Sequence, residues 1–221
     1  MGAHIFRSPL FHFIARHLAL LLVLSFVAIP LAAQTPPASS APRVVVVFNL
    51  RSNELQLIDH KYRVFYNKFE KKNLPIEGYD LRGAIQDEVM NTLVTDSRYQ
   101  WRVATEADKL DAAQLAEEKT RTPEMLSNAQ ADRVLVVDVN AIGGMITGLG
   151  KDQMWIGMVV TMLDRASGRK LWKKGVGDTI PFSGDLQKLQ SENQKELKEG
   201  INTLIEKTCV KLKAKVAESK I

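Results

Sequence analysis

Residues 131–142 read Ala-Asp-Arg-Val-Leu-Val-Val-Asp-Val-Asn-Ala-Ile, and we expect the domain to be organised around them. The core of this stretch, Val134–Val137, holds only apolar residues, and all of them except Leu135 are β-branched. A strand that does not alternate polar with apolar residues is usually covered on both of its faces. The stretch therefore predicts a strand in the middle of a sheet.

Other segments would pack beside or against this strand. Arg43–Leu50 contains four consecutive valines, which predict a second central strand. Asp80 is the predicted N-cap of a helix. That helix would bury the apolar residues that recur at every fourth position, which are Leu81, Ile85, Val89 and Leu93.

A long amphipathic helix is predicted at the C-terminal end of the chain. Its buried stripe would consist of Leu197, Ile201, Leu204, Ile205, Thr208, Leu212 and Val216. The order of strands and helices predicts an α/β or α+β fold. We expect a single domain with a mixed sheet of about five strands and with helices packed on it.

The connecting segments carry shorter patterns. Residues of alternating type across Tyr62–Asn67 predict a strand with one solvent-exposed face, which would end at Lys71–Pro75. The segment Ala107–Lys119 is rich in Ala, Leu and Glu and predicts a helix. Pro123 after a threonine predicts the start of a short helix that runs to Ala129.

The glycine-rich segment Gly143–Gly150 predicts a flexible hairpin tip between the central strand and a strand over Trp155–Asp164. A phosphate-binding loop is excluded there, because that motif needs a glycine where Met145 stands and a Ser or Thr where Asp152 stands. Lys170–Val176 predicts an edge strand, whose lysines would discourage pairing with another sheet.

The N-terminus has the pattern of a secretory signal. Arg7 and Arg16 precede the apolar run Leu18–Ile29, and small residues follow at its end. A basic region, an apolar run and a small-residue cleavage site are the parts of such a signal. We expect residues 1–33 to be a signal peptide that is cleaved between Ala33 and Gln34.

The protein is therefore predicted to be exported, either to the bacterial periplasm or out of the cell. In the alternative, the signal is not cleaved and anchors the protein in the inner membrane, which would be its only membrane contact. Residues 34–42 are rich in Pro, Ser and Ala and predict a tether. Residues 43–221 predict the single folded domain.

Histidine and cysteine are scarce outside the predicted signal, where His60 is the only histidine and Cys209 the only cysteine. One residue of each type cannot form a His/Cys zinc site or an intramolecular disulfide, so no metal and no cofactor is predicted. The net charge of +5 falls to +3 when the two arginines of the signal are removed. This mildly basic balance, together with export, argues against a nucleic-acid partner.

The order of these elements resembles a known periplasmic α/β domain. The residues that carry the resemblance are Arg43–Leu50, Ala131–Leu135 and the turn and strand Asp164–Trp172 before the closing helix. The domain is shared by the curli-secretion lipoproteins, the amino-terminal domain of the TolB translocation protein and the lipoproteins that activate penicillin-binding proteins. The resemblance implies work in the cell envelope through contact between proteins, and it implies no catalytic residues.

Two segments are candidate partner-binding surfaces. The first interleaves aromatic residues with cations and contains Tyr62, Phe65, Tyr66, Lys68, Phe69, Lys71 and Lys72. The second is the glycine-rich tip with Gly143, Gly144, Gly148 and Gly150. An aromatic and basic surface can bind an envelope protein, an anionic polymer or lipid head groups. In the structural alternative, Tyr62, Val64 and Tyr66 face the core and the lysines face water.

No catalytic residue is predicted. Asp138 ends the central strand and could act as a general acid if buried, but a solvated or hydrogen-bonded carboxylate is the favoured interpretation. Asp87 and Glu88 are adjacent on a helix, so they point in different directions and cannot flank one bond. Cys209 lies on the apolar stripe of the last helix and is expected to be a buried, unreactive thiol.

We therefore expect a non-catalytic envelope protein that binds or scaffolds another envelope protein or an envelope polymer. Two alternatives stay open at this point. One is a hydrolase that uses carboxylates without histidine, and the other is a protein that binds an anionic polymer or lipid surface. Trp101, Trp155 and Trp172 are expected in the core or at its rim.

Overall fold

Strand β5 (Arg133–Ile146) lies inside a mixed, seven-stranded sheet. Along one edge it pairs antiparallel with β6 (Gln153–Asp164). Along its other edge it pairs parallel with two strands in succession, first β1 (Arg43–Leu50) and then β2 (Glu54–Arg63). The predicted interior position of both hydrophobic runs is confirmed, because β1 in turn has β4 (Gln100–Val103) on its far side.

The computed structural model describes residues 41–63, 66–146, 152–182 and 194–219. The predicted signal peptide and residues 34–40 of the predicted tether lie outside these ranges. No helix within the described ranges is long and apolar enough to cross a membrane. The remaining elements are β3 (Tyr66–Pro75), α2 (Leu81–Leu93), η1 (Glu106–Asp108), α3 (Ala112–Ala116), η2 (Pro123–Leu126), β7 (Lys170–Pro181) and α4 (Lys195–Glu218).

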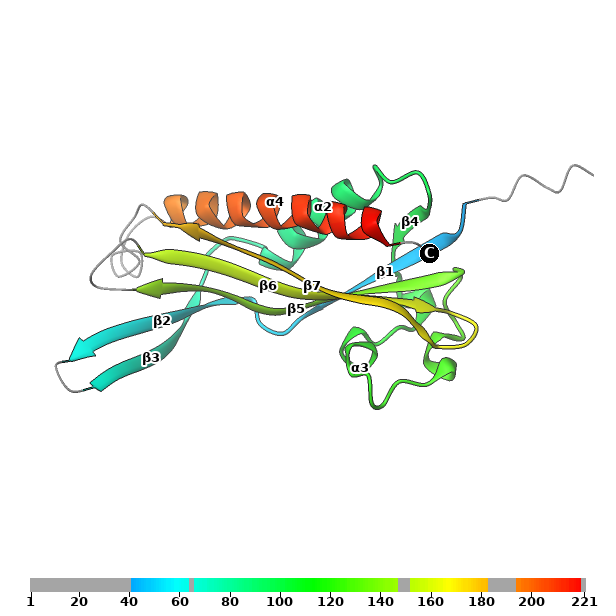
Figure 1. Ribbon diagram of the computed structural model, residues 1–221, viewed down its shortest axis with the longest axis horizontal. Coiled ribbons are helices and arrows are strands. Elements are labelled where there is room, and N and C mark those ends of the chain that lie inside the picture. The colour runs from blue at the N-terminus through cyan, green and yellow to red at the C-terminus, as the bar shows by residue number, and fades with distance from the viewer. Residues whose placement is uncertain (1–40, 64–65, 147–151, 183–193, 220–221) are drawn as a thin grey trace, which may run out of the picture. The chain divides into compact units, whose positions relative to one another are not determined.

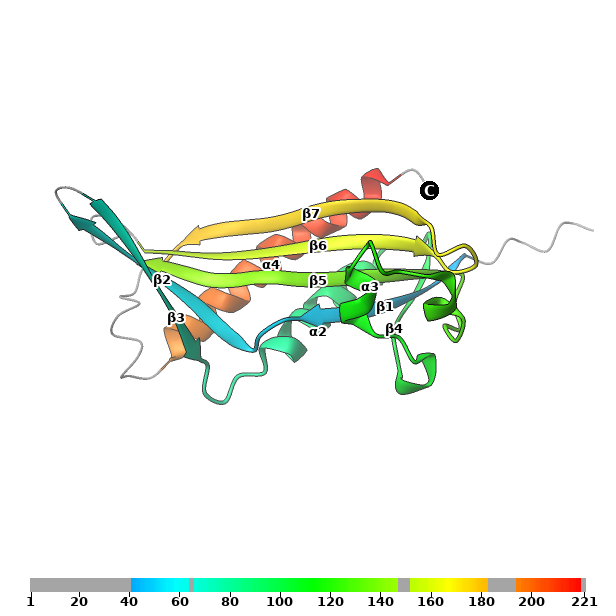
Figure 2. The ribbon, with the colours of Figure 1, turned by 90° about the horizontal axis from the view of Figure 1, so that it is seen from below.

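Helices cover the two faces of the sheet unequally. Helices α2 and α4 pack against each other on one face (Figure 1) and close the larger core, which includes Val46, Leu135 and Ile201. The other face has a smaller core under α3 and η2, to which Val45 and Val136 contribute. Each fully buried side chain of this size contributes about 1.5–3 kcal/mol relative to an exposed one. Figure 2 shows α3 in front of only one end of the sheet.

Local signals account for the two long helices. The side chain of Asp80 accepts a hydrogen bond from the backbone N–H of Gly83 at 2.9 Å, which confirms the predicted N-cap of α2. The predicted apolar stripe of α2 is buried. Helix α4 spans 24 residues and buries its predicted stripe, including Thr208, whose hydroxyl donates to the carbonyl of Leu204.

The segment after β1 forms two strands, whereas one was predicted. Strand β2 ends at Arg63 and β3 begins at its antiparallel partner, Tyr66. Strand β3 ends at Pro75, which lies within the predicted end segment Lys71–Pro75. The reversal places Leu74 beside Leu55 on the helix-covered face, where both are buried. Lysines are compatible with a strand at the edge of a sheet, because their charges discourage further pairing.

The single helix predicted over Ala107–Lys119 was wrong in its extent. The chain forms η1, passes through a left-handed conformation at Lys109 with φ of 49°, and begins α3 after Asp111. The Asp111 side chain accepts hydrogen bonds from two backbone N–H groups in the first turn of α3. The break arises because Asp108 turns inward to bind Arg102, which a continuous surface helix would prevent.

Three smaller predictions concern the elements around β5. Helix η2 begins at Pro123 as predicted, but it ends at Leu126 because the chain then turns to bury Ala129 in the smaller core. The β5–β6 hairpin is confirmed by its register. Strand β7 pairs only with β6 among the described strands, which confirms that it is an edge strand.

Candidate functional site

One half of the sheet face opposite α4 carries no described helix. Helix α3 packs on β1 and β5, at the end of the sheet where the smaller core lies. Beyond that core, the face partly exposes Ile58, Met145, Trp155, Gly157 and Val159. We call these five residues the open face. Partly exposed apolar residues that lie side by side on a sheet are typical of contact surfaces.

Strand register places Trp155 in the middle of the open face. It pairs with Gly143 of β5, which pairs in turn with Gln56 of β2. The benzene half of the indole lies over Gly143, because a Cβ built on that glycine would be 2.4 Å from Cζ2 of Trp155 and 2.3 Å from the carbonyl oxygen of Gln56. Gly143 is therefore required for the indole to lie this close to the strand.

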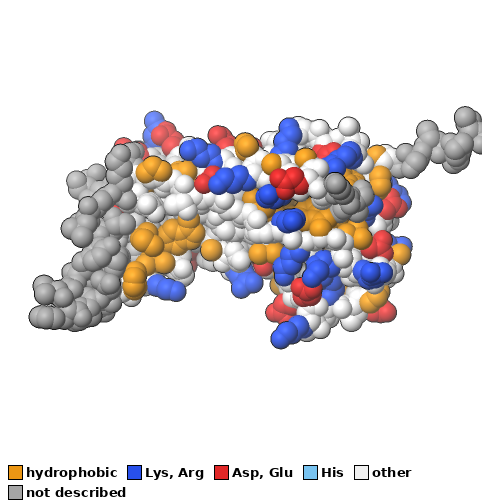
Figure 3. All heavy atoms as spheres, in the orientation of Figure 1, with side chains coloured by type: hydrophobic (Ala, Val, Ile, Leu, Met, Phe, Trp, Pro, Cys, Tyr) orange, Lys and Arg blue, Asp and Glu red, His pale blue; other side chains and the backbone are white. Residues whose placement is uncertain are grey.

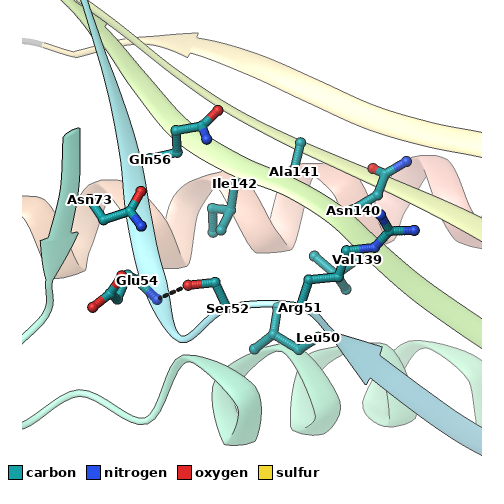
Figure 4. A pocket seen from close by; sticks show the side chains of 10 residues that line it. All are labelled: Leu50, Arg51, Ser52, Glu54, Gln56, Asn73, Val139, Asn140, Ala141 and Ile142. Carbon is teal, nitrogen blue, oxygen red and sulfur yellow. Dashed lines mark hydrogen bonds between the residues drawn. The ribbon is translucent and has the colours of Figure 1, made fainter. Parts of the chain in front are cut away.

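A hollow of about 190 Å³ borders the open face at the bend between β1 and β2 (Figure 4). The pairing of β1 with β5 ends at Val139, and the pairing of β2 begins at Gly143. Within the described residues, Asn140–Ile142 thus have no strand partner at that edge of β5. Asn140 is also the extra residue of a β-bulge opposite β6. The hollow is lined by Leu50, Arg51, Ser52, Glu54, Gln56, Asn73, Val139, Asn140, Ala141 and Ile142.

The polar side chains of the hollow come from both sides of this gap. Figure 4 shows Gln56, Asn73 and Glu54 on one side and Arg51 and Asn140 on the other. The hydroxyl of the serine at the bend accepts a hydrogen bond from the backbone N–H of Glu54 at 3.1 Å, which helps to fix the bend. The hollow therefore combines amides with one cation and one anion.

Asp138 lies beside the hollow and is only 8% exposed. Its Oδ1 accepts a hydrogen bond from Nδ2 of Asn49 at 2.7 Å, and its Oδ2 lies 3.4 Å from Nη2 of Arg51. These contacts confirm the hydrogen-bonded interpretation of Asp138. Both carboxylate oxygens are occupied in joining the end of β1 and the bend to β5.

The predicted aromatic and basic segment forms the β2–β3 hairpin, which extends away from the rest of the sheet (Figures 1 and 2). Phe69 is 56% exposed, and Lys71 and Lys72 are exposed as well. Lys71 pairs with Ile58, so it lies on the side of the open face, and Phe69 lies on the same side two residues away. Lys72 pairs with the buried Leu57 and lies on the opposite side.

The structure leaves part of this predicted surface untested. Phe65, Gly148 and Gly150 lie outside the described residues, and so do the side chains of Tyr62, Val64, Tyr66 and Lys68. Gly143 and Gly144 lie inside β5, so their predicted place in a flexible tip was wrong. Both glycines pair with β2 on one side and with β6 on the other, which restrains their backbone.

No protein-family model and no curated protein matches the sequence. The fold is found in solved bacterial structures. The hypothetical protein CT253 from Chlamydia trachomatis superimposes with a TM-score of 0.52 at 10% identity, over 80% of this chain and 97% of that chain. This likeness shows the fold alone.

Two other solved structures are less similar. The protein XCC0632 from Xanthomonas campestris, of the DUF330 family, gives a TM-score of 0.47 at 11% identity, over 81% of this chain and 85% of that chain. The lipoprotein GNA1162 from Neisseria meningitidis gives 0.38 at 12% identity, over 67% of this chain and 90% of that chain.

Sequence reasoning missed Trp155, Gln56, Asn73 and Asn140 as site residues. Trp155 could have been found from its position in β6. Its side chain points to the opposite face from the buried residues on either side of it, and it is nevertheless apolar. Apolar residues in both phases of a strand indicate two apolar faces. The polar residues carried no such signal, because only the bend between β1 and β2 brings them together.

The remaining candidate, Cys209, is 1% exposed on the buried side of α4. Burial, followed by the negative charge of Glu88, raises the pKa of its thiol to about 12. The thiolate, which is the reactive form, is therefore scarce at neutral pH. Within the described residues, no group of three or more His, Cys, Asp or Glu side chains could hold a metal ion.

Proposed function

We propose that this chain is exported to the bacterial envelope and acts there by binding another envelope component, a protein or a polymer, without catalysis. The observation that carries the proposal is the open face, with Trp155 at its centre and the exposed Phe69 on the adjoining hairpin. Aromatic residues and methionine are enriched in contact surfaces relative to the rest of a protein surface. The export signal that the sequence predicts in residues 1–33 supports the location.

The geometry favours binding over hydrolysis by carboxylates. Such a hydrolase needs two carboxyl groups that flank one bond, one of them free to give up a proton. Asp138 instead accepts a hydrogen bond from Asn49 and pairs with Arg51, so its oxygens are committed to contacts within the fold. Glu54 lines the hollow on the opposite side from Arg51.

The geometry also favours a specific partner over a generally anionic surface. Electrostatic binding to lipid head groups or a polyanion needs cations that gather on one face. The register of β3 places Lys71 on the side of the open face and Lys72 on the opposite side. On β7, Lys170 and Lys173 pair with Glu118, which offsets part of their charge.

Site-specific photocrosslinking in cells tests this proposal. A benzoylphenylalanine in place of Phe69 should form an adduct with the partner, whether the partner is a protein or a polymer. The matched control is the same group in place of Val210, which is 71% exposed on α4. We expect an adduct at position 69 that is several-fold stronger than at position 210, read by gel mobility and mass spectrometry.

A second substitution ties the adduct to the open face. Val159→Asp places a charge on the open face at a partly exposed position, and it should weaken the adduct at position 69. Val210→Asp is its control and should leave the adduct unchanged. The proposed binding surface would be contradicted if the adducts at positions 69 and 210 had equal yields. It would also be contradicted if Val159→Asp left the yield of the adduct at position 69 unchanged.

A further inference from the structure

We propose that the hollow between the β1–β2 bend and β5 binds a neutral saccharide unit, with Trp155 as the adjoining aromatic platform. This inference rests on the proposed function, because it names the class of envelope component that the site would take. Its support comes from three features of the hollow: its polar groups, the unpaired edge of β5, and the flat surface beside it.

The polar groups of the hollow suit a neutral ligand rich in hydroxyl or acetamido groups. Gln56, Asn73 and Asn140 each carry an amide, which offers donors and an acceptor together. Arg51 and Glu54 are the charged residues among those that line the hollow, and their charges are opposite. Convergent polar groups of this kind fix the orientation of a small ligand.

The edge of β5 adds backbone groups to this set. Neither β1 nor β2 pairs with β5 between Val139 and Gly143. The backbone of Asn140–Ile142 is therefore open to the hollow. Backbone N–H and C=O groups need hydrogen-bond partners, and a ligand hydroxyl can serve as either a donor or an acceptor. The gap spans only these residues, which is too short for an added peptide strand.

The size of the hollow fits one sugar ring rather than a long chain in a tunnel. Its volume of about 190 Å³ equals the share of roughly six water molecules in the liquid. The rest of a longer saccharide would then lie outside the hollow, on the open face. Arg51, which is 65% exposed and lies 3.4 Å from Asp138, keeps donors free to reach such a ligand.

Trp155 supplies the surface that a sugar ring needs on its apolar side. The C–H groups on one face of a pyranose pack against a flat aromatic ring, while its hydroxyls point to the rim. The indole lies over Gly143, whose strand neighbour Gln56 lines the hollow, so ring and hollow adjoin. Beyond it, Gly157 pairs with Gly177, and the side chain of Asn140 lies over Gly157, because a Cβ on that glycine would be 3.3 Å from Oδ1 of Asn140.

Calorimetric titration of the exported chain with the N-acetylglucosamine trimer, and in parallel with the glucose trimer, tests the proposal. We expect at least one trimer to bind, with an affinity that changes little between low and high salt. Asn140→Ala should weaken that binding by about tenfold, because it removes a ligand hydrogen bond from an exposed position. Asn128→Ala, an exposed asparagine in the connection before β5, should leave it unchanged.

Tryptophan fluorescence provides the second readout. The trimer should change the emission of the wild-type chain and of Trp101→Phe, but not of Trp155→Phe, which keeps an aromatic ring over Gly143. Trp101 lies half-buried in β4 and donates its indole N–H to the Asp96 carbonyl at 3.1 Å. If neither trimer gives heat or an emission change, or if binding occurs only at low salt, the saccharide proposal is overturned. A protein adduct at position 69 would still support the proposed function in that case.

Discussion

Asp108→Asn is expected to lower the free energy of unfolding by about 2–3 kcal/mol, because it removes the charge of a buried carboxylate that is hydrogen-bonded to the partly exposed guanidinium of Arg102. Asp108 is 2% exposed, and its oxygens lie 2.6 and 2.7 Å from the two terminal nitrogens of Arg102. The same carboxylate accepts hydrogen bonds from the backbone N–H groups of Thr105 and Gln130. An asparagine cannot accept all of these bonds and leaves the guanidinium without its counter-charge.

Urea unfolding followed by tryptophan fluorescence measures this effect. The matched control is Asp132→Asn, since Asp132 pairs with Arg43 at 3.7 Å with both side chains more than half exposed. Exposed pairs of this kind contribute about 0–1 kcal/mol. If both substitutions cost the same, Asp108 does not hold the chain between β4 and β5 as the contacts indicate.

The pH dependence of stability gives the same carboxylate a second signature. The hydrogen bonds from Arg102, and then those from Thr105 and Gln130, hold the pKa of Asp108 well below its ordinary value of 3.8. Its contribution is therefore complete above the unfolded-state pKa and is lost as the pH falls towards the folded-state pKa. We expect the wild-type chain to lose stability more steeply than Asp108→Asn below about pH 4. Parallel curves for the two proteins would contradict this role.

Gly143→Ala is expected to destabilise the fold by about 3 kcal/mol, near the upper end for overpacking. The added Cβ would meet the backbone carbonyl oxygen of Gln56 at 2.3 Å and the indole of Trp155 at 2.4 Å. The indole could rotate away, but the carbonyl belongs to the neighbouring strand and cannot move without shifting β2.

Gly175→Ala is the matched control for this prediction. Gly175 also lies in a strand of the sheet, and a Cβ there would meet no atom within 4 Å. We expect it to be neutral or to stabilise the fold by about 0.5 kcal/mol, because alanine reduces the entropy of the unfolded chain. Thermal or urea unfolding of both variants checks the pair. A Gly143→Ala protein as stable as Gly175→Ala would show that β2 and Trp155 do not pack against β5 at this position.

Continuous apolar runs and local capping signals could be read from the sequence alone. Val134–Val137 and the valines of Arg43–Leu50 predicted strands inside the sheet, since a run without polar residues is stable only where both faces are covered. Asp80 predicted the start of α2, because its side chain needs only the next turn of the same helix. The stripe of α4 predicted its buried side in the same local way.

Other elements depended on partners far along the chain. The reversal between Arg63 and Tyr66 contains neither Gly, Pro, Asn nor Asp, so no turn signal marked the hairpin. The break at Lys109 follows from the pairing of Asp108 with Arg102. Helix propensities do not include such a tertiary contact. In both places a tertiary contact overrode the local preference.

The candidate site is the clearest case of what only the tertiary structure decided. The sequence determined that the chain has apolar strands, a capped helix and an amphipathic C-terminal helix, because each depends on residues close together in the chain. The export signal stays a prediction from the same kind of local pattern. It could not determine that β1 and β2 would share one edge of β5, that the bend between them would leave a hollow, or that Trp155 would lie over Gly143. Strand pairing joins residues that are far apart in sequence, so the site exists only once the sheet has formed.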